Sequence, residues 1–136
     1  MDIRTMLRDI RRYDVMVGRK LDELGNVKAM VEYTGSAMGG FGGGSFNPHR
    51  KEDSIIRCID LTKSLESTIC KLTEIKTIAM DRVDSLKDAD MVDVMYRRYF
   101  RFQKWEDIAT DLGMSKRWVL ELHGKALKEL DGRECT

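Results

Sequence analysis

Apolar residues recur at spacings of three and four along most of the chain, which is the period of an amphipathic α-helix. The first such pattern runs from residue 2 to about residue 33, with charged side chains between its apolar members. It forms one narrow seam, typical of a coiled coil or of two packed helices. Because a lone helix with so narrow a seam is unstable, the seam requires a partner. Its members are Ile3, Met6, Ile10, Tyr13, Val17, Leu21, Leu24, Val27 and Val31.

A second pattern of the same period covers residues 53–86 and predicts a second long helix, either antiparallel to the first in one chain or paired between subunits. Residues 35–52 separate the two, with six glycines from Gly35 to Gly44 and the only proline, Pro48, so we expect a flexible Gly-rich linker there. This linker is longer than an antiparallel hairpin requires, which leaves exchange between chains open. The second apolar stripe comprises Ile55, Ile56, Ile59, Leu65, Ile69, Leu72, Ile75, Ile78 and Ala79.

The remaining residues, 87–136, predict a smaller helical domain that contains a helix, a tight turn and a second helix over residues 105–122. Asp88 is a candidate N-cap for the helix that opens the domain. Gly113 should end the first helix of the pair, and Ser115 should cap the second. The spacing is that of a helix-turn-helix, although an ordinary helical corner used only for packing stays an alternative. The residues expected to pack across the turn are Ile108, Ala109, Val119 and Leu122.

Composition supports an all-α fold, because Lys, Arg, Glu, Asp, Leu, Ile and Met dominate and proline occurs once. The expected architecture is two long N-terminal helices, forming a coiled-coil-like hairpin or a dimerisation element, followed by the helix-turn-helix domain. No apolar run approaches the roughly 20 residues of a membrane span, and the charged amino terminus does not resemble a signal peptide. We therefore expect a cytoplasmic protein with no membrane partner.

The sequence contains no evident pattern of a catalytic site or a metal site. The three cysteines lack the spacing of a metal site, and there are only two histidines, so we expect neither a metal nor a cofactor. No Ser/His/Asp grouping and no paired carboxylates in an apolar setting are evident, which argues against an enzyme.

Charge is nearly balanced overall, at +1, but is unevenly distributed. The stretch from Arg97 to Lys104 contains four basic residues and no acid, and two more basic residues follow at the start of the second motif helix. Such a local stripe can hold a phosphate backbone, although a solvated helix face explains the first group equally well.

The segments VMYRRYF (94–100) and WEDIATDLGMSKRWVLELHGKALKEL (105–130) resemble region four of bacterial sigma factors and the phage-encoded ArpU and RinA types of late-gene and autolysin regulator. The resemblance covers the chain from residue 87 onwards. The sequence departs from that pattern at Phe102, where glycine is usual, and at Lys104, where serine or threonine is usual, so the start of the first motif helix should differ in shape. The matching positions are Arg98-Tyr99, Trp105, Ile108-Ala109, Leu112-Gly113, Ser115, Val119, Ala126-Leu127 and Leu130.

This resemblance implies a sequence-specific DNA-binding transcription regulator of a phage or prophage, with the second motif helix in the major groove of double-stranded DNA. Alternatives are a phage small terminase-like DNA-packaging protein and an interaction protein that binds RNA polymerase. We expect a homodimer or higher homo-oligomer through the long helices. The expected base contacts are Ser115, Lys116, Arg117 and Glu121, and the expected phosphate contacts are Arg97, Arg98, Arg101, Lys104 and Lys125.

Overall fold

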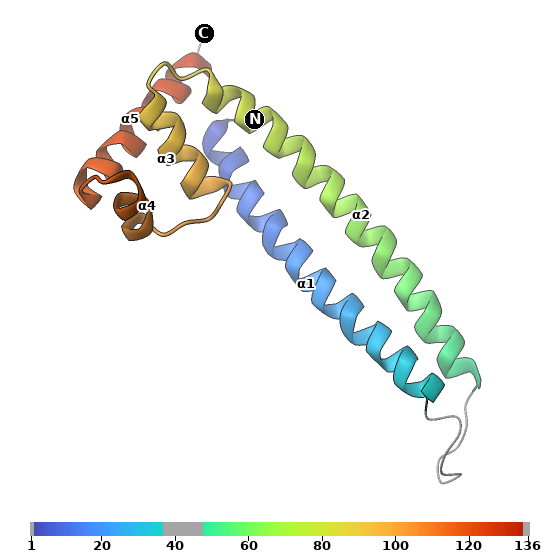
Figure 1. Ribbon diagram of the computed structural model, residues 1–136. Coiled ribbons are helices and arrows are strands. Elements are labelled where there is room, and N and C mark those ends of the chain that lie inside the picture. Colours follow the sequence, from blue (N-terminus) through green and yellow to red (C-terminus); the bar gives the residue numbers. More distant parts are fainter. Residues whose placement is uncertain (1, 37–47, 135–136) are drawn as a thin grey trace. The chain divides into compact units, whose positions relative to one another are not determined.

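The computed structural model describes residues 2–36 and 48–134, and every regular element in these ranges is an α-helix (Figure 1). The expected all-α class is confirmed. Among these described helices, none combines the length and the apolar character that crossing a bilayer requires. The helices are α1 (Ile3–Ser36), α2 (Pro48–Asp84), α3 (Ala89–Tyr99), α4 (Trp105–Leu112) and α5 (Lys116–Glu134).

The two long helices reach further into the glycine-rich segment than the sequence predicted. Residues 35–36 are the end of α1, and residues 48–52 already belong to α2, so the predicted linker 35–52 was too long. Pro48 fits the first position of α2, because the N–H that proline lacks would have no intrahelical partner there. The rest of that linker, residues 37–47, lies outside the described residues, and its expected flexibility stays a prediction.

The chain divides into two compact units whose boundaries fall inside α1 and α2. The middle unit is Val15–Cys70, and the terminal unit combines Met1–Asp14 with Lys71–Thr136. The sequence instead predicted consecutive segments with boundaries at residues 34, 52 and 86. The difference arises because the first turns of α1 pack with the C-terminal helices.

In the middle unit, α1 and α2 run antiparallel, side by side (Figure 1). The ammonium of Lys20 donates to the hydroxyls of Ser64 and Thr68 at 2.7 Å each, and Arg57 forms an ion pair with Glu23. Partner numbers fall along α2 as they rise along α1, which defines the antiparallel direction.

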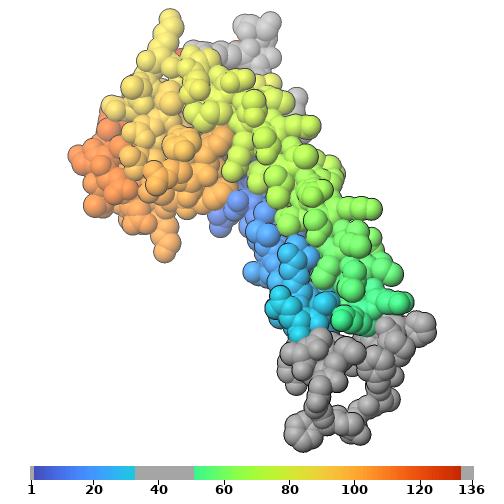
Figure 2. All heavy atoms as spheres, turned by 45° about the vertical axis from the view of Figure 1, so that its right-hand side comes forward, coloured from blue at the N-terminus to red at the C-terminus, as the bar shows by residue number. Residues whose placement is uncertain are grey.

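Burial in the middle unit is confined to a narrow seam. Among the side chains of this unit that the structure describes, the buried ones are Leu24 and Val27 of α1 and Leu65 and Thr68 of α2. Two helices cover only one face of each other, so many of the predicted stripe residues remain in contact with solvent. Figure 2 shows side chains of this part of α2, in green, at the surface. The large apolar side chains that stay exposed in this unit, by 42% to 56%, are Val15, Leu21, Met30, Ile55, Ile56, Ile59 and Ile69.

The terminal unit has a larger core, to which the amino-terminal turns of α1 contribute. The Asp2 carboxylate accepts a hydrogen bond from the Thr5 amide at 2.6 Å and so caps α1. Arg4 forms an ion pair with Asp131 of α5 at 2.9 Å. The residues buried in this unit include Ile3, Met6, Leu7 and Ile10 from α1, Ala79 and Val83 from α2, and Ala126, Leu127 and Leu130 from α5.

Candidate nucleic-acid interface

The turn between α4 and α5 is built by a glycine and a serine, as the sequence predicted. Gly113 has φ 66° and ψ 34°, in the left-handed region that favours glycine. The Met114 amide donates to the Ala109 carbonyl at 2.9 Å, which closes the end of α4. The Ser115 hydroxyl accepts a hydrogen bond from the Trp118 amide at 3.1 Å and caps α5.

A small apolar cluster fixes how α3, α4 and α5 pack. The predicted packing of Val119 and Leu122 against Ile108 and Ala109 is confirmed, and all four are buried. Val94 of α3 completes the cluster and was not among the residues that the sequence predicted to pack here. Its spacing of three from Met91, which packs against the same cluster, is the signal that identifies it.

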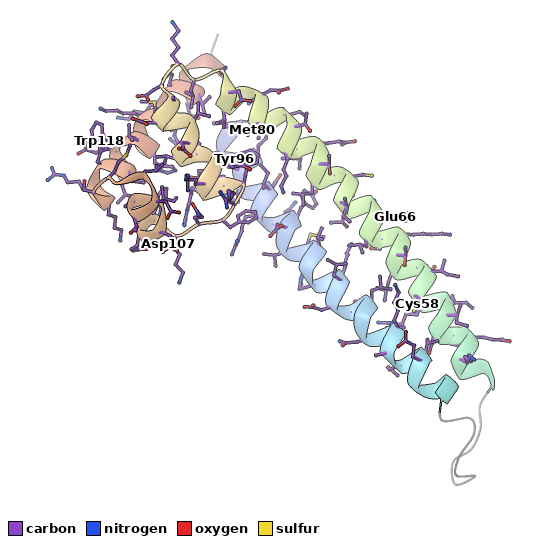
Figure 3. All side chains as sticks on the ribbon, viewed as in Figure 1. Cys58, Glu66, Met80, Tyr96, Asp107 and Trp118 are labelled. Carbon is purple, nitrogen blue, oxygen red and sulfur yellow. The ribbon has the colours of Figure 1, made fainter. Side chains whose placement is uncertain are left out.

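The first turns of α5 present their polar side chains to solvent. Ser115, Lys116, Arg117 and Glu121, the four predicted base-contacting residues, are all exposed, whereas Val119 between them is buried. The Arg117 side chain is 91% exposed. The side chain of Trp118 on the same helix (Figure 3) is 41% exposed. The four residues are therefore accessible at the amino-terminal end of α5.

Both basic residues at the start of α5 have an acidic neighbour. Lys116 Nζ lies 2.8 Å from Glu106 Oε1, and Arg117 Nε lies 3.6 Å from Glu121 Oε1. The hydrogen bond from Lys116 holds the pKa of Glu106 below its ordinary value. These pairs are exposed, so water screens them and either base can exchange its partner at little cost.

The predicted phosphate-binding residues differ in how far they are already engaged. Arg97 is the least available, because its side chain is 22% exposed and pairs with Asp93 at 2.7 Å and with Asp111 at 3.3 Å. Arg101 and Lys104 are exposed, and Lys125 is exposed with its ammonium 5.2 Å from the ring centre of Trp118. The predicted set is therefore only partly presented at the surface.

Arg98 contacts a group of rings formed by Tyr99, Trp105 and His123. Its guanidinium lies 4.5 Å from the ring centre of Trp105 and donates to the Gln103 carbonyl at 3.0 Å. The Trp105 ring meets His123 edge-on at 4.7 Å, and His123 is hydrogen-bonded to the hydroxyl of Tyr99. Burial, followed by the charges of Arg98 and Arg4, holds the pKa of His123 below its ordinary value. These contacts join α3, α4 and α5. The lowered pKa of His123 favours the neutral form of its imidazole beside the Arg98 guanidinium.

The connection from α3 to α4 contains a feature that the helical pattern did not predict. Phe102 has φ 55° and is the one non-glycine residue with positive φ in the described ranges. Such a conformation costs a bulky residue roughly 1–2 kcal/mol. Lys104 occupies the N-cap of α4 without a side-chain hydrogen bond. The sequence did indicate an unusual connection here, because Phe102 and Lys104 are the two positions at which it departs from the sigma-factor pattern.

The geometry of α4, the turn and α5 is thus fixed by contacts within residues 89–134. The likeness to sigma-factor region four stays a prediction that depends on the matching residues quoted above. Comparisons of the chain with protein-family models, with curated protein sequences and with solved structures found no match.

Proposed function

We propose that this protein is a sequence-specific DNA-binding transcription regulator, as in the phage-encoded regulators it resembles, and that α4, the turn and α5 act as its helix-turn-helix. The observation that carries the proposal is the two-sided character of the start of α5. Lys116, Arg117 and Glu121 are exposed on one side, while Val119 and Leu122 anchor the other side in the core. A helix held in this way is free to enter a groove about 12 Å wide.

In the proposed complex, the exposed side of α5 faces base edges in the major groove. A guanidinium or an ammonium donates to guanine N7 and O6, which suits Arg117 or Lys116, and a carboxylate accepts from cytosine N4, which suits Glu121. Formation of these contacts replaces the Lys116–Glu106 and Arg117–Glu121 pairs. The hydroxyl of Ser115 already accepts a hydrogen bond from the Trp118 amide, so its role in this complex is to fix the start of α5 and not to contact a base.

Phosphate contacts in this proposal come from the exposed cations around the reading helix. Arg101, Lys104 and Lys125 are exposed, and Arg98 contributes through its position beside Trp105. Arg97 takes part only if its two carboxylate partners release it. Because each neutralised phosphate releases counterions, affinity should fall steeply as salt concentration rises.

The proposed regulator acts as a dimer formed through the middle unit. Ile55 and Ile59 lie one helical turn apart on α2, and both are exposed. Exposed apolar side chains gathered on one element favour a protein interface. Light scattering at tens of micromolar protein should give the mass of a dimer, and a double substitution Ile55→Lys with Ile59→Lys should give a monomer. The matched substitution Ile78→Lys, at an exposed isoleucine of the terminal unit, should keep the dimer. A monomeric mass for the unsubstituted chain would overturn this part.

A second candidate function, binding to RNA polymerase without reading DNA, is favoured by the exposure of Trp118 and Leu120, each 41% exposed on α5. Aromatic residues are enriched at protein interfaces. Binding of purified core polymerase by the full chain, in the absence of DNA and lost in Trp118→Ala, would support this candidate over groove binding.

The decisive experiment is selection of duplexes from a random library by the full chain, followed by gel shifts with the selected site. Arg117→Ala should weaken specific binding by on the order of 1–3 kcal/mol. Arg19→Ala removes the same charge from the middle unit and should leave the preference for the selected site unchanged. Failure to enrich any sequence, or an Arg117→Ala protein that binds its site as well as before, would overturn the proposal.

A further inference from the structure

The terminal unit contains a cavity of about 630 Å³ between the start of α1 and the connection that leads from α3 into α4. Its size falls within the range of about 300–1,000 Å³ that is typical of small-molecule sites. Leu7 and Leu127 are the aliphatic residues of its lining. The other residues that line it are Arg4, Arg8, Arg11, Arg98, Tyr99, Phe102, Lys104 and His123.

The charge of this cavity is strongly one-sided. Its lining includes five basic side chains, from Arg4, Arg8, Arg11, Arg98 and Lys104, and no carboxylate. In the described part of the chain, Arg4 is the only one of these five in an ion pair, with Asp131. The charges of Arg8 and Lys104 also help to lower the pKa values of Asp2 and Glu106, neither of which lines the cavity. The positive potential of this cluster also acts on His123, because the charges of Arg98 and Arg4 add to the effect of burial in lowering its pKa. Because like charges repel one another, this excess of basic groups around one cavity favours an anionic ligand.

The cavity also has an aromatic wall. Tyr99, Phe102 and His123 line it, and the guanidinium of Arg11 lies 4.8 Å from the ring centre of Phe102. Phe102 is held at φ 55°, a conformation that a phenylalanine adopts only at a cost in energy. Backbone strain of this kind is concentrated at ligand sites, where the side chain it presents has a use. The strained residue therefore provides a flat apolar surface beside the cations, and this observation is independent of the charge count.

We propose that this cavity binds a small phosphate-bearing molecule with a planar ring, the chemical class of the nucleotides. Guanidinium groups form paired hydrogen bonds with phosphate oxygens, and an ammonium adds a point charge. A planar ring stacks on aromatic side chains and on guanidinium planes. The arginines and Lys104 bind the phosphates in this arrangement, and the wall around Phe102 takes the ring. The cavity shares Arg98 and Lys104 with the phosphate contacts of the proposed function, but it uses none of the residues proposed to contact bases on α5.

Isothermal titration calorimetry of the full chain with ADP tests the proposal, with adenosine and pyrophosphate as the two halves of the ligand. ADP should bind at least about tenfold more tightly than either half, since both parts of the cavity are used together. No heat of binding with ADP at millimolar concentration would overturn the proposal. Equal affinity for ADP and pyrophosphate would overturn the part assigned to the aromatic wall.

Matched variants separate this cavity from general attraction to a basic protein. Arg8→Gln and Lys104→Gln alter exposed side chains and should each weaken ADP binding by about tenfold, with helix content by circular dichroism unchanged. Arg12→Gln removes the same charge one residue beyond Arg11, at a position that does not line the cavity, and should bind ADP as the unsubstituted chain does. Equal weakening in all three variants would show nonspecific attraction and overturn the proposal.

A backbone phosphate of DNA is the competing occupant of the same cations. If ADP does not bind, while Arg8→Gln and Lys104→Gln weaken binding to duplexes of any sequence, the cluster holds DNA and the small-molecule proposal is wrong. If ADP binds and the chain selects no DNA sequence, the cavity proposal stands and the proposed function fails. The two proposals therefore fail separately.

Discussion

Lys116 Nζ lies 2.8 Å from Glu106 Oε1, so an ion pair joins the first turn of α5 to the first turn of α4. This contact neutralises one of the two basic groups at the exposed start of α5. Because both side chains are exposed, the pair restrains Lys116 more than it stabilises the fold.

Removal of this restraint should strengthen DNA binding. In Glu106→Gln, Lys116 becomes available to a phosphate or a base, so affinity should rise and the slope of log affinity against log salt should steepen by up to about 0.9. Fluorescence anisotropy with a labelled duplex at several salt concentrations measures both, and urea unfolding should show an unchanged midpoint. Unchanged affinity and slope would mean that Lys116 does not approach DNA.

The strain of the backbone at Phe102 can be measured by comparing the stabilities of two variants that both lack the ring. Phe102→Ala and Phe102→Gly both lose the contact with Arg11, but only alanine keeps a β-carbon at φ 55°. The glycine variant should therefore be more stable than the alanine variant by about 1 kcal/mol in urea unfolding. Equal stability, or a less stable glycine variant, would indicate that the connection relaxes to another conformation.

A better N-cap residue at the start of α4 should stabilise the protein. Lys104 is an N-cap whose side chain caps nothing, so Lys104→Ser should raise the free energy of unfolding by about 0.5–2 kcal/mol by accepting a hydrogen bond from an amide of the first turn. Ser115→Ala is the reciprocal test, because it removes the cap of α5 and should cost about 1 kcal/mol. Both values come from denaturant unfolding at neutral pH. A Lys104→Ser protein no more stable than the parent would show that the first turn of α4 is satisfied in another way.

His123 should make the fold sensitive to mild acid. Burial, aided by Arg98 and Arg4, holds its pKa in the folded state below the ordinary value of 6.5. As pH falls through 6.5 the unfolded chain therefore takes up a proton before the folded chain does, and the free energy of unfolding decreases until the folded pKa is reached. Urea unfolding at a series of pH values between neutrality and mild acid measures this slope.

Two histidine variants identify the group responsible for that slope. His123→Gln should flatten the dependence on pH in this range, because the titrating imidazole is gone. His49→Gln removes the only other histidine of the chain and should leave the slope in place. An unchanged slope in His123→Gln would assign the acid sensitivity to other groups.

Local signals in the sequence were sufficient for the parts of the fold that depend on neighbouring residues. Asp88 accepts a hydrogen bond from the Asp90 amide, Gly113 ends α4 and Ser115 caps α5, each as predicted, because each depends on the backbone within a few residues. The packing across the α4–α5 turn was predictable for the same reason.

Contacts between distant segments could not be read from the same pattern. The apolar period of α2 fits both the buried Leu65 and the exposed Ile55 and Ile56, since periodicity finds helix faces but not which face is covered. The pair of Arg97 with Asp93 lies within one helical turn of α3, but its pair with Asp111 depends on tertiary packing. The same is true of Arg8 and Lys104, which line one cavity although they are far apart in the sequence. The sequence therefore could not predict which of the candidate cations are exposed and which already have a carboxylate partner.

The burial of Ile3, Met6, Leu7 and Ile10 beside the carboxyl-terminal helices has a practical consequence for dissection of the chain. A fragment that starts at residue 87 would lose this apolar lining, leave Leu127 at an open surface and deprive Asp131 of Arg4. Such an excised fragment would be prone to aggregate, and its failure to recognise a duplex would say nothing about the intact protein. A faithful minimal version would have to join the opening helical turns to everything from Lys71 onwards, so that the buried Ala79 and Val83 are kept.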